Sequence, residues 1–280
     1  MSFLSSLMNA LPGAVAQGLA WGIMAIGVYI TFRILDVADL TVDGSLATGG
    51  AVCVMLIRAG VNPWLAMLCA LVSGMLAGLV TGLFHTRCGI PAILAGILTQ
   101  LALYSINLRI MGGKANQAVS VDKYHLLLSQ RYVRELSLDN PLPLLVVLTA
   151  VIVAALYWFF GTEKGSSVRA TGANPHMARA QGINTSANIV LGLMLSNGLV
   201  ALSGALLAQY QGSSDINMGR GAIVYYIVLQ IVLQIGLNTN DLKLITALIV
   251  ALFLTLSYLN LKKTRRKPRR AAKKGVKQHA

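Results

Sequence analysis

Six apolar runs, each about as long as a bilayer is thick, set the strongest limit on what this chain can fold into. They cover residues 13–35, 63–84, 91–111, 141–160, 187–211 and 242–261. A helix of about 20 apolar residues crosses the hydrocarbon core, where each backbone N–H and C=O must be satisfied within the helix. The composition agrees, because 56% of the residues are hydrophobic and only 11% are charged. We therefore expect an all-α, polytopic membrane protein with roughly six to eight full spans.

Two further stretches, 36–58 and 221–237, do not fit an ordinary span. The first holds three carboxylates and several glycines, which weaken a helix, and the second is interrupted by two glutamines. Irregular backbone occurs at membrane depth only where protein or a water-filled cavity covers it. We expect both stretches to be broken or re-entrant. Residues 38–44 also resemble residues 214–219, and paired breaks in two halves of a membrane chain indicate a pathway near the midplane.

The net charge of +14 is concentrated at the C-terminus. Ten of the 23 Lys and Arg lie in residues 262–280, which contain no Asp or Glu, so the rest of the chain has 13 basic and 9 acidic residues. This distribution predicts one transmembrane domain over residues 1–261 and a basic, disordered cytoplasmic tail that contacts anionic lipid. The tail has no aromatic residues around which a fold could form, so we expect no nucleic-acid partner.

The sequence shows no cluster of residues typical of a metal site or an active site. Cys53, Cys69 and Cys88 lie in or beside apolar runs, and the four histidines are scattered. Neither set has metal-ligand spacing, and no nucleophile is paired with a base. We expect no metal, no cofactor and no enzymatic activity.

The loop at 161–186 is the one long polar interval in the second half of an otherwise apolar chain. Within it, Asn174 suits an N-cap, Pro175 suits the first helical position, and Gly182 supplies the left-handed residue that ends a helix. A helix of about seven residues is unstable alone in water, so it must dock onto a protein or a lipid surface. Met177 is its only large apolar side chain, which favours a protein, and its basic character favours the cytoplasmic side.

Two motifs carry a resemblance to a known family. The loop reads G-x3-R-A-x-G-x-N-x3-A-R-x2-G-I-N from Gly165 to Asn184. It resembles the cytoplasmic loop of bacterial ATP-binding-cassette (ABC) importer permeases of the branched-chain amino acid and ribose type. The segment DLTVDGS at 39–45 resembles the tryptophan/tyrosine uptake subgroup of these permeases. Chain length, span order and both motifs agree, so the resemblance covers nearly the whole chain.

The resemblance implies a transmembrane permease subunit of an importer, which forms the path for a small solute such as an amino acid. The implied partners are cytoplasmic ATPase subunits, a second permease copy in a homodimer, an external substrate-binding lipoprotein, and the lipid bilayer of the bacterial inner (plasma) membrane. ATP hydrolysis would occur on the separate ATPase, and this chain has no Walker A pattern. The loop at 161–186 would couple to the ATPase through Arg169, Gly172, Asn174, Pro175, Ala178, Arg179 and Gly182.

Polar residues within or beside the apolar segments are the candidates for the solute path, because such side chains are costly at membrane depth unless paired or hydrated. They are Asp39, Thr41, Asp43, Gln100, Asn107, Asp215, Asn217, Gln230 and Gln234. A structural role is the alternative for each of them. Asp36 and Asp39 could pair with Arg33 or cap the helix that starts near Gly44. Asp43 or Thr41 could be the N-cap of that helix, and the amides could bond between helices.

An ion-coupled secondary transporter is the alternative function, with the intramembrane carboxylates of Asp39, Asp43 and Asp215 acting as a relay. The two functions differ in their energy source. Uptake that needs ATPase subunits and survives an uncoupler indicates an ABC importer. Uptake that stops when the proton gradient collapses indicates a secondary transporter.

Overall fold

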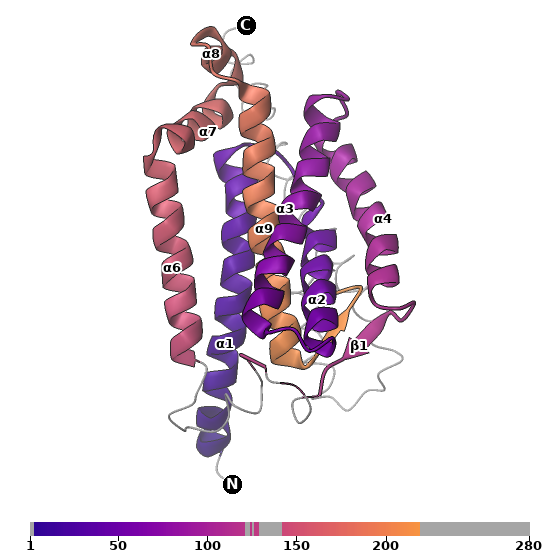
Figure 1. Cartoon of the computed structure of the whole chain (residues 1–280). Helices are drawn as coiled ribbons and strands as arrows, with labels where there is room; N and C mark the ends of the chain where they lie inside the picture. Colours follow the sequence, from indigo (N-terminus) through magenta and orange to yellow (C-terminus); the bar gives the residue numbers. More distant parts are fainter. Residues whose placement is uncertain (1–2, 121–123, 125, 129–141, 219–280) are drawn as a thin grey trace, which may run out of the picture. The chain divides into compact units, whose positions relative to one another are not determined.

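The computed structural model describes residues 3–120, 124, 126–128 and 142–218, which form a bundle of helices with one short sheet (Figure 1). All of them belong to one unit, Met1–Arg220. The elements are α1 (Phe3–Tyr29), η1 (Ile30–Ile34, a π-helical turn), α2 (Val42–Arg58), α3 (Pro63–Thr86), α4 (Ala92–Ile110), β1 (Asn116–Ala118), α6 (Leu142–Gly161), α7 (Glu163–Ala173), α8 (Pro175–Ala180), α9 (Thr185–Gln211) and β2 (Ser213–Asp215). The predicted segments 221–237 and 242–261 and the tail 262–280 lie outside the described residues.

Five helices in the described part of the chain are long and apolar enough to cross a membrane. They are Pro12–Ile34, Pro63–Thr86, Ala92–Ile110, Leu142–Gly161 and Thr185–Gln211. Each agrees with a predicted run to within two residues at either end. The chain is therefore an all-α, polytopic membrane protein, as the sequence predicts.

Helix α9 is the buried centre of the described bundle. It packs against α1, α2 and α3, and Figure 1 shows it between them. Of its most apolar stretch, 72% is buried within the chain, whereas the corresponding share of α6 is 6%. Helix α6 packs on α1 and α7, and most of its apolar surface is not buried by the described residues.

Close backbone contact holds α3 against α9. A Cβ atom added to Gly74 would lie 2.3 Å from the carbonyl oxygen of Asn197, and one added to Gly78 would lie 2.3 Å from that of Leu193. Two positions four residues apart on one helix share a face, so these glycines form one contact row. Small residues in such a row let two membrane helices approach closely enough for backbone to touch backbone.

The segment 36–58 is broken rather than re-entrant. After η1, Asp36 adopts a left-handed conformation with φ of 55°, and residues 37–40 have no regular structure before α2 begins. The beginning of the segment follows η1, which packs against α7, whereas at its end Arg58 Nη1 donates a hydrogen bond to Gln117 Oε1 in β1. The segment therefore passes from one end of the bundle to the other, and its helical part is the 17-residue α2.

A two-stranded sheet closes one end of the bundle. β1 and β2 pair antiparallel, with Gln117 opposite Ser214, and so tie the segment after α4 to the end of α9. Figure 1 shows this sheet at the opposite end of the bundle from α7 and α8. We call the first the sheet end and the second the loop end.

The α3–α9 contact predicts that Gly78→Ala destabilises the protein, although alanine is normally the better helix former. The added Cβ meets backbone, which cannot rotate away, so the helices must separate at a cost of about 1–3 kcal/mol. Gly22→Ala on α1 is the matched control, because a Cβ there has no neighbour within 4 Å. Thermal unfolding in detergent should show a lower Tm for the first variant only. Equal Tm values for the two variants would contradict the packing argument.

Candidate functional site

The polar loop at 161–186 holds two helices, whereas the sequence predicts one. The additional helix is α7, whose glycines and small polar residues give only a weak helical signal. It is held by α9, because Asn188 donates from Nδ2 to Ser167 Oγ at 2.6 Å and to Thr171 Oγ1 at 2.9 Å. Tertiary contact thus stabilises a helix that local propensity does not reveal.

Helix α7 also packs directly on the end of the first span. A Cβ atom added to Gly172 would lie 1.8 Å from the carbonyl oxygen of Ile34, the last residue of η1. Only glycine allows this contact. Gly172 therefore acts within the chain, where it joins the polar loop to the start of the broken segment 36–58.

Helix α8 is capped as the sequence predicts. Asn174 Oδ1 accepts hydrogen bonds from the backbone N–H groups of His176 at 3.1 Å and Met177 at 3.0 Å. Pro175 occupies the first turn, and Gly182 has a φ of 79°, which is left-handed. The helix proper is Pro175–Ala180, so it is one turn and a half long and depends on its caps.

The residues of α8 divide between an inner and an outer face. Ala178 is buried against the chain, and Arg179 Nε donates to Thr185 Oγ1 at 2.8 Å, which ties α8 to the first turn of α9. Met177 is 61% exposed, and Arg169 on α7 is exposed as well. Of the predicted coupling residues, Ala178 and Gly172 therefore position the loop, whereas the exposed side chains are the ones a partner can reach.

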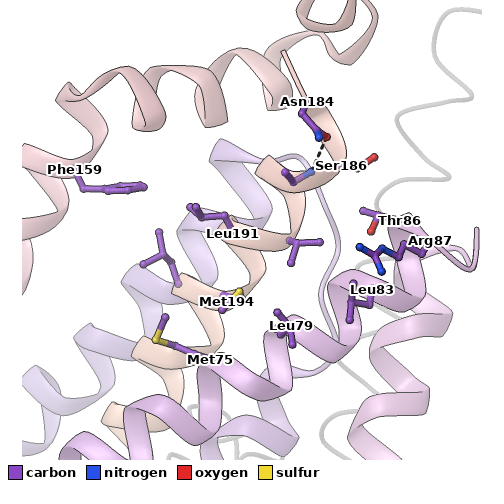
Figure 2. A pocket seen from close by; sticks show the side chains of 13 residues that line it. Met75, Leu79, Leu83, Thr86, Arg87, Phe159, Asn184, Ser186, Leu191 and Met194 are labelled. Atoms are coloured by element: carbon purple, nitrogen blue, oxygen red, sulfur yellow. Dashed lines mark hydrogen bonds between the residues drawn. The ribbon is translucent and has the colours of Figure 1, made fainter. Parts of the chain in front are cut away.

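An apolar cleft of about 670 Å³ lies next to this loop, between α3 and α9 (Figure 2). Met75 and Met194 line its inner part, and Arg87 and Asn184 lie at the loop end, where Asn184 Oδ1 accepts a hydrogen bond from the Ala187 N–H at 3.1 Å. The short polar turn after α3 and the polar loop at 161–186 therefore lie at the same end of the bundle. The lining is mostly apolar, so the cleft offers few groups for recognising a polar solute.

Asp39 is paired within the chain, but with other partners than expected. Its Oδ1 accepts the Thr41 backbone N–H at 2.8 Å and its Oδ2 accepts Asn197 Nδ2 at 2.6 Å. The predicted pairing of Asp36 or Asp39 with Arg33 is wrong, since Arg33 is exposed and makes no ion pair in the described part of the chain. Thr41 occupies the N-cap position of α2, as one of the alternatives expected, but its side chain makes no cap hydrogen bond there.

Asn197 on α9 is the centre of a buried polar network that the sequence analysis did not single out. Besides Asp39, it bonds Ser45, whose Oγ donates to Asn197 Oδ1 at 2.6 Å. Beside it, the Thr41 and Thr81 hydroxyls share a hydrogen bond of 2.8 Å. The network joins the irregular residues 37–40 to α2, α3 and α9. A polar residue in the middle of a long apolar run was the available signal for Asn197.

Three predicted path residues come together in one pocket between α2 and α4. Asp43, Gln100 and Asn107 line it together with Tyr104, and its volume is about 260 Å³. Asn107 is buried, and its Nδ2 donates weakly to the Gly44 carbonyl oxygen at 3.5 Å. Its Oδ1 has no hydrogen-bond partner among the described residues. We refer to this site as the α2–α4 pocket.

The two segments that resemble each other in sequence, 38–44 and 214–219, also share a local hydrogen bond, whereas the predicted break 221–237 lies outside the described residues. Asp215 Oδ1 accepts the Asn217 backbone N–H at 2.7 Å, just as Asp39 accepts that of Thr41. Ile216, between these two residues, lines the α2–α4 pocket, so the segment after β2 borders that pocket from the sheet end. Gln230 and Gln234 lie outside the described residues.

The buried network predicts that Asn197→Leu destabilises the protein more than loss of a simple interhelical bond. The leucine leaves a carboxylate oxygen and a hydroxyl unpaired, at a cost of about 3 kcal/mol. Ser203→Ala is the control, because the fully buried Ser203 hydroxyl makes one bond, to the Ala20 carbonyl oxygen at 2.7 Å. It should lose about 1 kcal/mol. Unfolding in detergent measures both, and a loss for Asn197→Leu no larger than the control's would refute the network's role.

Comparison with known proteins places the whole chain in one family. Residues 11–267 match the family described as branched-chain amino acid transport system, permease component. The chain is 36% identical over 293 aligned residues to the tyrosine transport system permease protein of Clostridioides difficile (strain R20291), covering 93% of this chain and 96% of that one. It is 32% identical over 285 residues to the uncharacterized protein RP368 of Rickettsia prowazekii (strain Madrid E), covering 89% and 98%.

A more distant relative comes from a third system. The autoinducer 2 import system permease protein LsrC of Yersinia pestis (strain Pestoides F) is 29% identical over 241 residues, which cover 83% of this chain and 64% of that one. No solved structure matches the chain. The chain belongs to the family of branched-chain amino acid-type permease components of ABC transport systems for small solutes.

Proposed function

We propose that this chain is the permease subunit of a bacterial ABC importer that carries a small amino acid-like solute across the inner membrane. The observation that carries the proposal is the capped, outward-facing α8, held on α9 and presenting Met177 to a partner. The relative from Clostridioides difficile is named for tyrosine transport, which supports an aromatic amino acid as the solute. ATP hydrolysis takes place on the separate ATPase subunits.

In this proposal, α8 is the coupling helix. Its outer face, with Met177 and the adjacent Arg169, contacts a cytoplasmic ATPase. Its inner face is fixed to α9 through Arg179 and Thr185. Because α7 touches the end of η1 at Gly172, movement of α8 is passed to the start of the broken segment 36–58. The loop end of the bundle is then cytoplasmic, and the sheet end is external.

The solute path runs along the broken segment and through the α2–α4 pocket. Asp43, Gln100 and Asn107 line it, and Asp215 and Asn217 border it at the sheet end. Asp39 and Thr41 hold its wall in place through their bonds to α9 and α3. A second permease copy completes the membrane part, and an external lipoprotein delivers the solute. The basic tail 262–280, outside the described residues, is cytoplasmic.

Co-purification with native partners tests this proposal directly. The chain, isolated from its own membrane in mild detergent, should carry an ATPase subunit and a solute-binding lipoprotein. Proteoliposomes containing the assembly should accumulate L-tyrosine when ATP is supplied on the side of the membrane where the ATPase lies. An uncoupler should leave this uptake unchanged. Uptake that needs a proton gradient and no ATPase would instead establish the ion-coupled transporter.

The exposed face of α8 predicts that Met177→Glu separates the permease from its ATPase. A charge placed in a desolvated apolar contact is costly, so retention of the ATPase should fall at least tenfold. Insertion into the membrane should not change, because the side chain is exposed in the isolated chain. Met177→Leu, which keeps an apolar side chain of similar size, is the matched control. The measurement is the ATPase-to-permease ratio after affinity purification, and equal ratios for both variants would exclude α8 as the contact.

A further inference from the structure

A buried acceptor that lacks a donor lines the α2–α4 pocket. Asn107 is 1% exposed, and its Nδ2 points to the Gly44 carbonyl oxygen. That carbonyl can only accept a hydrogen bond, so it fixes the amide with Oδ1 directed elsewhere. Oδ1 has no partner among the described residues. A buried polar atom without a partner is costly in a membrane interior, which indicates that a donor not supplied by the described residues completes it.

The other polar groups of the pocket also favour a ligand that donates hydrogen bonds. Asp43 brings a carboxylate and Gln100 brings a second amide. No lysine, arginine or histidine is among the described residues that line the pocket. An ionised carboxylate accepts hydrogen bonds and attracts positive charge, so the group that best complements this lining is a cation carrying several N–H donors.

The apolar residues of the pocket limit the size and shape of the ligand. Ile97, Leu101 and Ile216 are apolar, and the ring of Tyr104 is 43% exposed. The volume of about 260 Å³ lies below the range of roughly 300–1,000 Å³ typical of sites for drug-sized ligands. A single amino acid with an apolar or aromatic side chain suits both the volume and the lining.

We infer that the α2–α4 pocket is a binding site for the solute within the permease, and that it recognises the protonated amino group through Asn107 Oδ1 and the Asp43 carboxylate. The inference rests on the proposed importer function and adds to it. A path needs only to let the solute pass, whereas this pocket makes the permease itself select for an ammonium group.

Direct binding without the external lipoprotein tests the inference. The full chain, purified with its ATPase and placed in nanodiscs, is titrated with radiolabelled L-tyrosine. Tyramine, which keeps the amine and lacks the carboxylate, should compete. The deaminated analogue 3-(4-hydroxyphenyl)propionate, which keeps the carboxylate and lacks the amine, should compete at least tenfold less well. Equal competition by the two analogues, or no binding of tyrosine or tyramine by the wild-type protein, would overturn the inference.

Two variants and a control test whether Asn107 and Asp43 bind the amino group of the solute. Asn107→Leu and Asp43→Asn should each weaken binding of tyramine about tenfold or more, because each removes an interaction with a charged donor. Asp43→Asn preserves side-chain size and so serves if Asn107→Leu fails to fold. Thr99→Val is the control: Thr99 is buried on the same helix, its Oγ1 donates to the Ala95 carbonyl oxygen at 3.0 Å, and it is not among the residues lining the pocket. It should bind as the wild type does.

The two proposals fail in different ways. If the chain purifies with an ATPase but binding of tyramine by Asn107→Leu and Asp43→Asn stays within twofold of wild type, the pocket assignment is wrong and the importer function stands. If no ATPase accompanies the chain while both variants lose tyramine, the pocket is a real amine site and the importer function is wrong.

Discussion

The close contact of α9 with its neighbours is the interaction on which the rest of the structure depends. Lipid tails are as apolar as leucine, so membrane helices gain little by hiding apolar surface from each other. What holds them together is close packing and hydrogen bonding. A Cβ atom on Gly204 would lie 2.0 Å from the Leu46 carbonyl oxygen of α2, and Ser196 Oγ donates to the Gly27 carbonyl oxygen of α1 at 2.7 Å. With the glycines of α3, these contacts surround α9 on three sides.

Fixing α9 also fixes the broken segment that follows η1. Residues 37–40 have no helical bonds of their own, and their position is set by the bond from Asn197 to Asp39. Each carboxylate oxygen of Asp39 accepts a hydrogen bond from within the chain, so Asp39 has a structural role in the broken segment. Asn107 Oδ1, by contrast, has no donor among the described residues. Hydrogen-bond satisfaction therefore separates two residues that the sequence analysis placed in one group of path candidates.

The features that the sequence predicted are those set by local physics. The length of an apolar run determines whether it can span, and the caps Asn174 and Gly182 act within their own turn. The features that it did not predict depend on residues far apart in the chain. Asp39 and Asn197 are separated by 158 positions, and without the fold a nearby cation such as Arg33 is the natural partner to expect. Helix α7 shows the same limit, because its stability comes from Asn188 on a different helix.

The broken segment 36–58 lies between the α7 contact at one end and the α2–α4 pocket, and this position suits it to link the two. In the proposed importer, a force applied to α8 would reach η1 through the contact of α7 at Gly172, whereas α9 is buried among α1, α2 and α3. Just beyond η1, Asp36 has a positive φ and the following residues lack helical bonds, so this is where the described chain can change direction with least loss. Helix α2, which follows, forms one wall of the α2–α4 pocket. In the proposed importer, a shift of the first turn of α2 would move Asp43 relative to Asn107 on α4, and would so change how the α2–α4 pocket binds an ammonium group without rearranging the core.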